Sequence, residues 1–198
     1  MRIFFYYSPK KFINSYLVGN EKTGEAIFID PIRITIDIIE NISHHKYKLK
    51  SVLFTHTDKE LQLEGLHTIM KIYNPKVIGV APDLKIENSV VIKGDGIIDT
   101  AGFKIRHFSV QGLAAGAYMF QIENVVFSGA AIRAGEIGET SNIYAVRNLQ
   151  RTLFQKIFNQ NDEIIIMPEL GPPTSIGSER LYNNALKKKH DSPRNSLF

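Results

Sequence analysis

Residues 168–179 read P-E-L-G-P-P-T-S-I-G-S-E, and they mark a strand that passes through a loop into a helix. The apolar run Glu163–Met167 before this stretch predicts a buried strand. The following helix is expected to begin near Thr174 or Ser175, because Glu179 is placed to complete an N-terminal cap. A second stretch, V-F-S-G-A-A-I-R-A-G-E-I-G-E-T at residues 126–140, leaves another predicted strand in the same way. Both stretches therefore extend from strands of the expected core.

Strands and helices alternate along the remainder of the chain. Short apolar runs between turn residues predict strands at Ile3–Tyr7, Asn14–Val18, Glu25–Ile29, Ser51–Phe54, Val77–Val80, Val90–Ile92, Ile97–Ile98, Phe103–Ser109, Ala117–Ile122 and Val125–Ser128. Apolar residues at helical spacing predict helices over 34–42, 66–73 and 144–158. This pattern alone indicates a mixed α and β domain.

The composition is that of an ordinary globular chain. Its 198 residues suit one domain, and no apolar run approaches the roughly 20 residues that span a bilayer. The absence of cysteine excludes disulfides and zinc–thiolate sites, and the first residues lack the features of a signal peptide. We therefore expect a single domain over residues 1–187, a frayed tail over 188–198, and a cytoplasmic location without membrane contact.

The net charge of +4 is dispersed, apart from a basic cluster at residues 187–190. No interleaved aromatic residues and no nucleic-acid-binding motif accompany this cluster. It is therefore interpreted as a solvated chain end, and no nucleic-acid partner is expected.

The two stretches closely resemble segments of the metallo-β-lactamase-fold hydrolases, in particular their small glyoxalase II-like (hydroxyacylglutathione hydrolase-like) members. In that family the stretches read P-G-H-G-P-x-T-x-I-G-x-E and V-F-T-G-D-T-L-F-x-G-x-I-G-R-T. Asn14–Val18 resembles the family's N-x-Y-L-V strand, and Ile29-Asp30-Pro31 resembles its I-D-P turn. The resemblance runs from about Asn14 to Leu186 and implies a four-layer αββα sandwich of the α/β (α+β) class.

Most positions that carry zinc ligands in this family hold other residues here. The family's L-T-H-x-H-x-D-H motif corresponds to residues 53–61, where only the first histidine is matched, by His56. The remaining former metal-site positions, in chain order, are Asp58, Glu60, Leu61, Leu113, Ala130 and Leu170. The stretch before Gly65 is one residue longer than in the family, and no second histidine occurs before His67.

These replacements remove the chemistry on which the family depends. A hydrolytic zinc ion needs about three histidine or carboxylate ligands and an open position for water, whose pKa it lowers to about 7. Leucine and alanine have no lone pairs to offer. We therefore expect no cofactor, and zinc or another divalent metal enters only under an alternative in which His56, Asp58 and Glu60 hold it.

The remaining polar groups allow both functional and structural interpretations. Carboxylates at Asp58, Glu60 and Glu64 suit Mg²⁺ or Ca²⁺, but acidic residues that open a helix are also favoured by its dipole. Glu169 and Arg133 stand at positions where the family pattern has uncharged residues. Arg133 is a candidate to bind an anion. An ordinary salt bridge or solvent exposure is the alternative for both.

Three functions follow from these observations. The favoured one is a non-catalytic protein whose former metal cleft binds a small molecule or a protein partner. The alternative is a divergent thioester or ester hydrolase that uses a non-family metal site, or metal-free acid–base chemistry by His56 and Glu169. The third is a subunit of an assembly, including a homo-oligomer.

Overall fold

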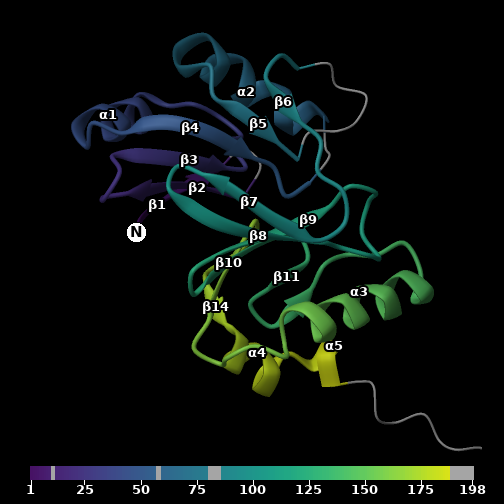
Figure 1. Ribbon diagram of the computed structural model, residues 1–198. Coiled ribbons are helices and arrows are strands. Elements are labelled where there is room, and N and C mark those ends of the chain that lie inside the picture. Colours follow the sequence, from purple (N-terminus) through teal and green to yellow (C-terminus); the bar gives the residue numbers. More distant parts are fainter. Residues whose placement is uncertain (10–11, 57–58, 80–85, 188–198) are drawn as a thin grey trace, which may run out of the picture.

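The computed structural model describes residues 1–9, 12–56, 59–79 and 86–187, and only the backbone of residues 59–62, 64 and 187 (Figure 1). Asp58, Val80 and the expected tail over 188–198 lie outside the described residues. No helix within these residues combines the length and the apolar character needed to cross a membrane.

The first half of the chain forms a six-stranded sheet covered on one face by two helices. Its strands follow one another in chain order: β1 (Arg2–Ser8), β2 (Ile13–Asn20), β3 (Glu25–Ile29), β4 (Lys48–Leu53), β5 (Lys76–Ile78) and β6 (Ser89–Val90). The first three are antiparallel, and β3 to β6 are parallel. The helices α1 (Ile36–His44) and α2 (Lys59–Tyr73) make the crossovers between parallel strands. Right-handed crossovers place both helices on the same face of the sheet.

The second half forms another six-stranded sheet and the remaining helices. The sheet has the order β14 (Thr174–Ser175), β13 (Ile165–Pro168), β10 (Val125–Gly129), β9 (Tyr118–Ile122), β8 (Phe103–Ser109) and β7 (Gly96–Thr100). Only β10 and β13 are parallel. The helices are α3 (Ile143–Lys156), α4 (Ile176–Tyr182) and α5 (Asn184–Lys187), and a small hairpin joins β11 (Ile132–Arg133) to β12 (Glu136–Ile137).

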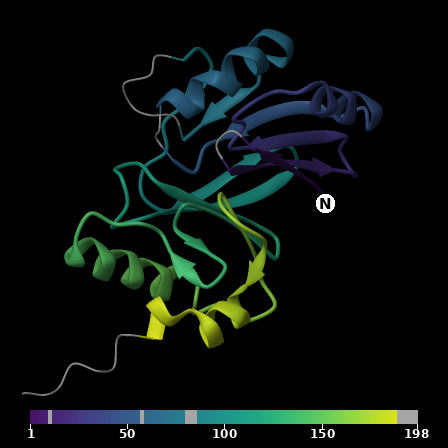
Figure 2. The same cartoon turned by 180° about the vertical axis from the view of Figure 1, so that it is seen from behind.

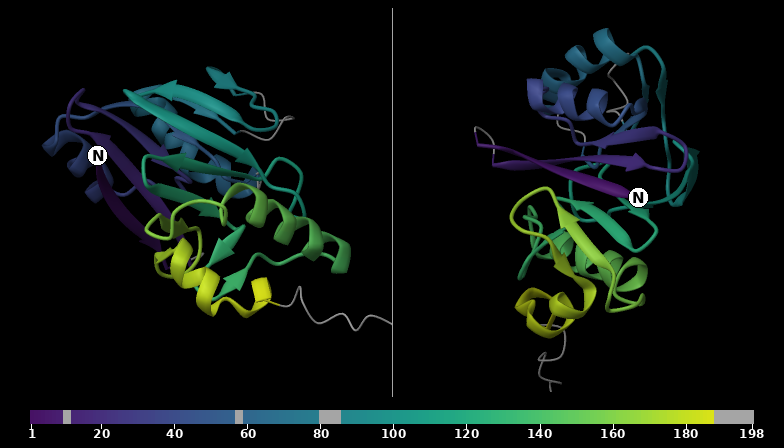
Figure 3. Two further views of the ribbon diagram at one scale, coloured as in Figure 1. Left: turned by 60° about the horizontal axis from the view of Figure 1, so that its bottom comes forward. Right: turned by 90° about the vertical axis from the view of Figure 1, so that its left-hand side faces the viewer.

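Three apolar layers hold the four layers of the fold together. One lies between α1, α2 and the first sheet, and another lies between the second sheet and α3 and α4. The central layer packs the inner faces of the two sheets together, with the Tyr16 and Phe127 rings 5.3 Å apart. Figures 2 and 3 show the resulting stack of helices, two sheets and helices. The expected four-layer αββα sandwich is therefore confirmed.

Differences from the predicted elements lie at element ends and in short elements. The strand predicted at Val90–Ile92 is reduced to Ser89–Val90, and the last long strand begins at Ile165 instead of Glu163. The hairpin of β11 and β12 and the short helix α5 were not predicted, because elements of two to four residues leave no periodic pattern.

The cap predicted at Glu179 is wrong in its mechanism. The helix α4 does start next to Ser175, whose hydroxyl accepts a hydrogen bond from the Ser178 amide at 3.1 Å. Glu179, however, is one residue too far along the helix to reach back to the cap, and its side chain is buried. Its carboxylate accepts hydrogen bonds from the Gly135 amide, the Thr174 hydroxyl and the Asn183 amide group, at 2.7–3.1 Å.

Substitution of Gly65 by alanine tests how closely α2 packs on the end of β3. A Cβ atom at Gly65 would lie 1.9 Å from the Pro31 carbonyl oxygen, which belongs to the backbone and cannot rotate away. We expect Gly65→Ala to lower the free energy of unfolding by about 1–3 kcal/mol through overpacking, although alanine is the better helix former. The matched control His67→Ala, at an exposed position of the same helix, should change it by less than about 0.5 kcal/mol in urea titrations. Equal stability of the two variants would contradict this close packing.

Candidate functional site

The candidate site lies where several strand ends meet at one edge of the two packed sheets. Thr55 and His56 follow β4, Ala130 follows β10, and Leu170 follows β13. Parallel strands end at the same edge of a sheet, so the loops that follow β10 and β13 begin side by side. The Tyr118 amide donates a hydrogen bond to the Thr55 carbonyl at 2.7 Å, which ties the second sheet to the end of β4.

Two adjoining hollows occupy this edge, and together we call them the cleft. One has a volume of about 220 Å³ and includes Thr55, His56, Leu113, Ala130 and Glu139 in its lining. The other has a volume of about 240 Å³ and is lined by Gly129, Ala130, Arg133, Gly138, Glu139, Glu169 and Leu170. The hollows share Ala130 and Glu139. Four positions at which the resemblance implies metal ligands, and which are far apart in the sequence, thus converge on the cleft: His56, Leu113, Ala130 and Leu170.

A tight backbone approach brings the end of β10 against the end of β4. Gly129 adopts a φ of +53°, and a Cβ atom at this position would lie 2.4 Å from the Thr55 hydroxyl oxygen. A side chain is therefore excluded both by the left-handed backbone and by lack of space. The approach also places Ala130 in the hollow that contains His56.

The Asp30 carboxylate fixes the loop that carries His56. It lies at the end of β3 with only 2% of its surface exposed. One oxygen accepts a hydrogen bond from the Thr55 amide at 2.8 Å, and the other accepts one from the Thr55 hydroxyl at 2.7 Å. The His56 Nε2 atom lies 3.8 Å from the first oxygen. Asp30 therefore orients Thr55 directly and places a carboxylate within ion-pair distance of His56.

Burial dominates the electrostatics of Asp30. Loss of water raises the pKa of the carboxyl from its usual 3.8 to about 7, although the hydrogen bonds from Thr55 act in the opposite direction. The sequence motif Ile29-Asp30-Pro31 located this residue, but its role in supporting the cleft was missed. An acidic residue directly after the apolar run Ala26–Ile29 is the signal that points to it.

Asn14 and Tyr16, at the start of β2, hold the loop that carries Glu169 and Leu170. The Asn14 side-chain amide donates to the Pro168 carbonyl at 2.9 Å and to the Gly171 carbonyl at 2.8 Å. The Tyr16 hydroxyl donates to the same Pro168 carbonyl at 2.6 Å. No local sequence pattern indicates this support, because the contacts join residues more than 150 positions apart.

Arg133 and Glu169 both line the second hollow, but the ion pair of Arg133 is with another residue. Its Nε and Nη2 atoms lie 2.7 and 2.5 Å from one Glu136 carboxylate oxygen, across the small hairpin. Glu169 is 7% exposed, and its backbone amide donates to the Gly129 carbonyl at 3.0 Å. Arg133 thus has the ordinary salt bridge that was the alternative to anion binding.

Glu139 is a cleft residue that the sequence analysis did not single out. It is exposed and touches both hollows. The signal was available, because I-G-E-T in this chain stands where the family pattern reads I-G-R-T. The position therefore carries a negative charge in place of the family's positive one.

The described residues do not fit the family's zinc centre. Leu113, Ala130 and Leu170 contribute no lone pairs, and His56 is the one histidine in the lining of the cleft. Within the described ranges, no group of three or more histidine, aspartate and glutamate side chains could hold a metal ion. Of the other former positions, Asp58 lies outside the described residues, and the side chains of Glu60 and Leu61 are also outside them.

Comparison with known proteins agrees with the observed architecture. No protein-family model matches the chain. An uncharacterised protein of Treponema pallidum (strain Nichols) is 26% identical over 168 residues, which cover 84% of this chain and 88% of that protein. The crystal structure of ETHE1 from Myxococcus xanthus is similar with a TM-score of 0.84 and 19% identity, over 95% of this chain and 86% of that one.

A metallo-β-lactamase from Staphylococcus aureus subsp. aureus COL is similar with a TM-score of 0.80 and 20% identity. That similarity covers 94% of this chain and 63% of the other. At these identities the structural similarity shows the fold, and the chain has the metallo-β-lactamase fold.

The raised pKa of Asp30 predicts a pH dependence of stability. Between about pH 4 and 7 the folded state binds more protons than the unfolded chain, so the free energy of unfolding falls as the pH rises. The slope from this one group is at most about 1.4 kcal/mol per pH unit, and it levels off above about pH 7. Asp30→Asn removes the titrating group. The stability of the wild type relative to this variant should therefore decrease from pH 4 to 7 in urea titrations, and a constant difference would contradict the shift.

Proposed function

We propose that this protein is a non-hydrolytic relative of the glyoxalase II-like enzymes, which uses its cleft to bind a small molecule or a segment of a protein partner. The single observation that carries the proposal is that Leu113, Ala130 and Leu170 line the same cleft as His56. The glyoxalase II-like assignment rests on the sequence motifs, and the absence of hydrolysis rests on the chemistry of these side chains.

Apolar residues at ligand positions suit a cleft that works without metal. A histidine or aspartate left in the wall of such a cleft without its ion would lose part of its hydration, at a cost of about 1–3 kcal/mol if it found no partner. Leucine and alanine avoid this cost and contribute apolar surface instead. Leu113 also packs against the apolar layer beneath the second sheet, so it supports the wall as well as lining it.

The shape and chemistry of the cleft suit an elongated ligand. Each hollow is smaller than the roughly 300 Å³ at which pockets for drug-sized ligands begin, but the two share Ala130 and Glu139 in their linings. We infer that one ligand spans both. Leu113, Ala130 and Leu170 would contact its apolar part, whereas His56 and Glu139 would contact polar groups. The supports from Asp30 and Asn14 keep these walls in place without the ligand.

The proposal includes a cytoplasmic location and no nucleic-acid partner. A chain of 198 residues without cysteine has no need of an oxidising compartment. Its modest net charge of +4 provides little attraction for a phosphate backbone.

A thioester or ester hydrolase is the second candidate, and the position of His56 favours it. The imidazole lines the first hollow and has a buried carboxylate at 3.8 Å, an arrangement that can orient a general base. Under this candidate His56 would activate a water molecule in the cleft, whereas Glu169 would act from the adjoining hollow.

Metal content separates the proposal from the family's zinc chemistry. We expect the protein, purified without chelator after growth with added zinc and manganese, to contain less than about a tenth of an equivalent of any transition metal by elemental mass spectrometry. The positive control is the variant with Leu113→His, Ala130→Asp and Leu170→His. With His56 it offers more than the three ligands that a zinc ion needs, so it should bind about one equivalent or more. A wild-type protein with one equivalent, lost on His56→Ala, would contradict the proposal.

Turnover of a hydroxyacyl-glutathione thioester tests the second candidate. We expect the wild-type protein and His56→Ala to hydrolyse it at the same rate as buffer, because no group in the described cleft replaces the metal-bound hydroxide. His67→Ala, which changes an exposed histidine outside the cleft, is the matched control. Hydrolysis that falls at least about a hundredfold on His56→Ala, but not on His67→Ala, would establish the hydrolase and overturn the non-hydrolytic proposal.

A further inference from the structure

The two large sheets end in four edge strands, and β1 differs from the other three. In the described residues, β6 and β14 have two residues each, and β7 has five residues, among them Asp99. The strand β1 has seven residues and pairs with β2 without a bulge from Arg2 to Ser8. Short edges, charges, prolines and bulges are the devices by which proteins keep sheet edges from pairing. The run Ile3–Tyr7 has none of them.

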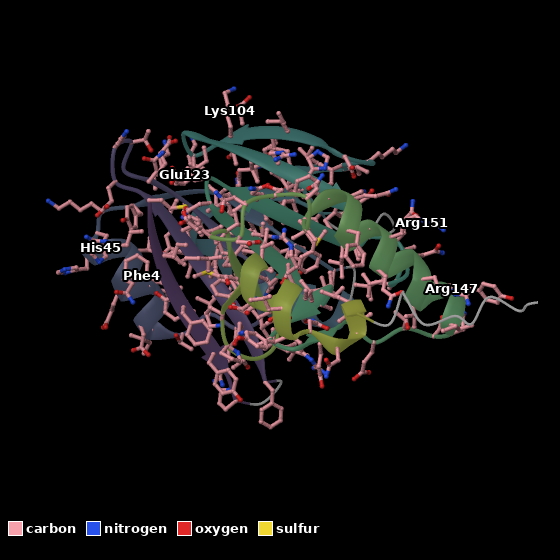
Figure 4. The ribbon with its side chains drawn as sticks, turned by 90° about the horizontal axis from the view of Figure 1, so that it is seen from below. Phe4, His45, Lys104, Glu123, Arg147 and Arg151 are labelled. Atoms are coloured by element: carbon pink, nitrogen blue, oxygen red, sulfur yellow. The ribbon has the colours of Figure 1, made fainter. Side chains whose placement is uncertain are left out.

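The one charged residue of β1 does not protect its edge either. The Arg2 guanidinium lies 2.8 Å from the Glu21 carboxylate and 3.2 Å from the His45 ring nitrogen of the same chain. Figure 4 shows His45 close to Phe4, whose ring centroid lies 5.0 Å from the imidazole. The positive charge is thus directed toward the first sheet's own hairpin and helix.

Two of the three side chains of β1 that face the second sheet, those of Phe5 and Tyr7, are aromatic and half exposed, whereas Ile3 is partly buried. Phe5 lies opposite Tyr16, with ring centroids 5.8 Å apart, and Tyr16 is the residue that packs on Phe127 of the second sheet. Phe5 and Tyr7 are nevertheless 51% and 52% exposed. The nearby Phe12 is 65% exposed, with its ring 6.5 Å from that of Tyr7. We call Phe5, Tyr7 and Phe12 the β1 patch. It is an apolar part of the inner sheet face that the second sheet leaves uncovered.

We propose that the β1 edge is a dimerisation site, at which β1 of a second copy of this chain pairs antiparallel across a two-fold axis at Phe5. This register uses all seven residues of the strand. It sets Phe5 opposite Phe5 of the second copy, Ile3 opposite Tyr7, and Arg2 opposite Ser8. Aromatic and aliphatic cross-strand pairs are favourable, and no like charges face each other. The first sheets of the two copies then form one continuous sheet. The interface is isologous, because the same residues of each copy form it, and it is closed at two copies.

A second copy accounts for both unusual properties of this edge, namely its unprotected backbone and the exposed β1 patch. Any extended peptide could satisfy the free backbone groups of β1, but a two-fold repeat also brings the β1 patch of each copy against that of the other. The inference is independent of the cleft, because β1 contributes no residue to its lining.

Disulfide trapping tests the register directly, because the chain contains no cysteine of its own. Directly opposite residues have Cα atoms about 4.5–5.5 Å apart, within the range for a disulfide. Phe5→Cys should therefore yield a cross-linked dimer on mild oxidation. In the two copies Tyr7 would lie more than about 13 Å from its equivalent, so Tyr7→Cys alone should not cross-link. A mixture of Ile3→Cys and Tyr7→Cys should cross-link, because these residues face each other.

Ile97→Cys is the matched control, since Ile97 is 64% exposed on the other long edge strand, β7. Equal cross-linking of Phe5→Cys and Ile97→Cys would reflect random collision and would overturn the proposed register. A cross-linked Tyr7→Cys homodimer, or the failure of the mixture to form the cross-linked heterodimer of Ile3→Cys and Tyr7→Cys, would overturn it as well.

Sedimentation equilibrium of the wild-type protein tests the dimer without any modification. We expect a monomer–dimer equilibrium from low micromolar concentrations upward, and Phe5→Lys should weaken it at least about tenfold by placing two lysines opposite each other. Ile97→Lys should leave it unchanged. Circular dichroism will check that each variant is folded, and Phe5→Thr replaces Phe5→Lys if the lysine variant is not. A wild-type monomer at several hundred micromolar, or a dimer that the Phe5 variants do not weaken, would overturn the proposal.

Discussion

The cleft depends on one buried carboxylate that joins the ends of two parallel strands. Asp30 closes β3, accepts two hydrogen bonds from Thr55 at the end of β4, and thereby fixes the start of the loop with His56. Gly129 then allows β10 to approach the same threonine closely. Strand ends from both sheets thus meet at Thr55, and the residues beyond them line a common cavity. Burial deprives this carboxylate of water, which disfavours its charged form and raises its pKa to about 7.

In this arrangement, the residues that support the cleft differ from the residues that line it. The hydrogen bonds from Asn14, Tyr16 and Asp30 hold the surrounding loops as a reactive centre would require. The side chains that those loops present, however, are mostly leucine and alanine. Because fold and function are specified by different residues, the same scaffold can pass from one role to another through a few substitutions in its loops.

The architecture was predictable to the extent that it depends on local patterns. The alternation of apolar and polar residues in β8 and the helical spacing of apolar residues in α3 are visible in the sequence. The resemblance of the motifs to a known family then implied the four-layer arrangement of such elements. The convergence of Leu113, Ala130 and Leu170 followed from the same motifs. The burial of Asp30, the bonds from Asn14 to a loop more than 150 residues away and the Glu136 partner of Arg133 did not, because each depends on a long-range or rotameric choice. Glu179 lies one residue beyond the position from which its side chain would complete an N-terminal cap. Its carboxylate instead has a long-range role, because it accepts a hydrogen bond from Gly135.

The three hydrogen-bonding partners of Glu179 have a mechanical consequence. Its carboxylate joins α4 to Gly135, which lies in the turn of the hairpin that carries Arg133 at the rim of the cleft. The rim of the cleft and α4 are therefore joined by hydrogen bonds, so a displacement of the hairpin is expected to move α4 as well. Leu181 and Tyr182, on the same helix, are 61% and 74% exposed. A fluorophore attached at either position lies outside the lining of the cleft, and its signal would test whether a ligand in the cleft displaces α4.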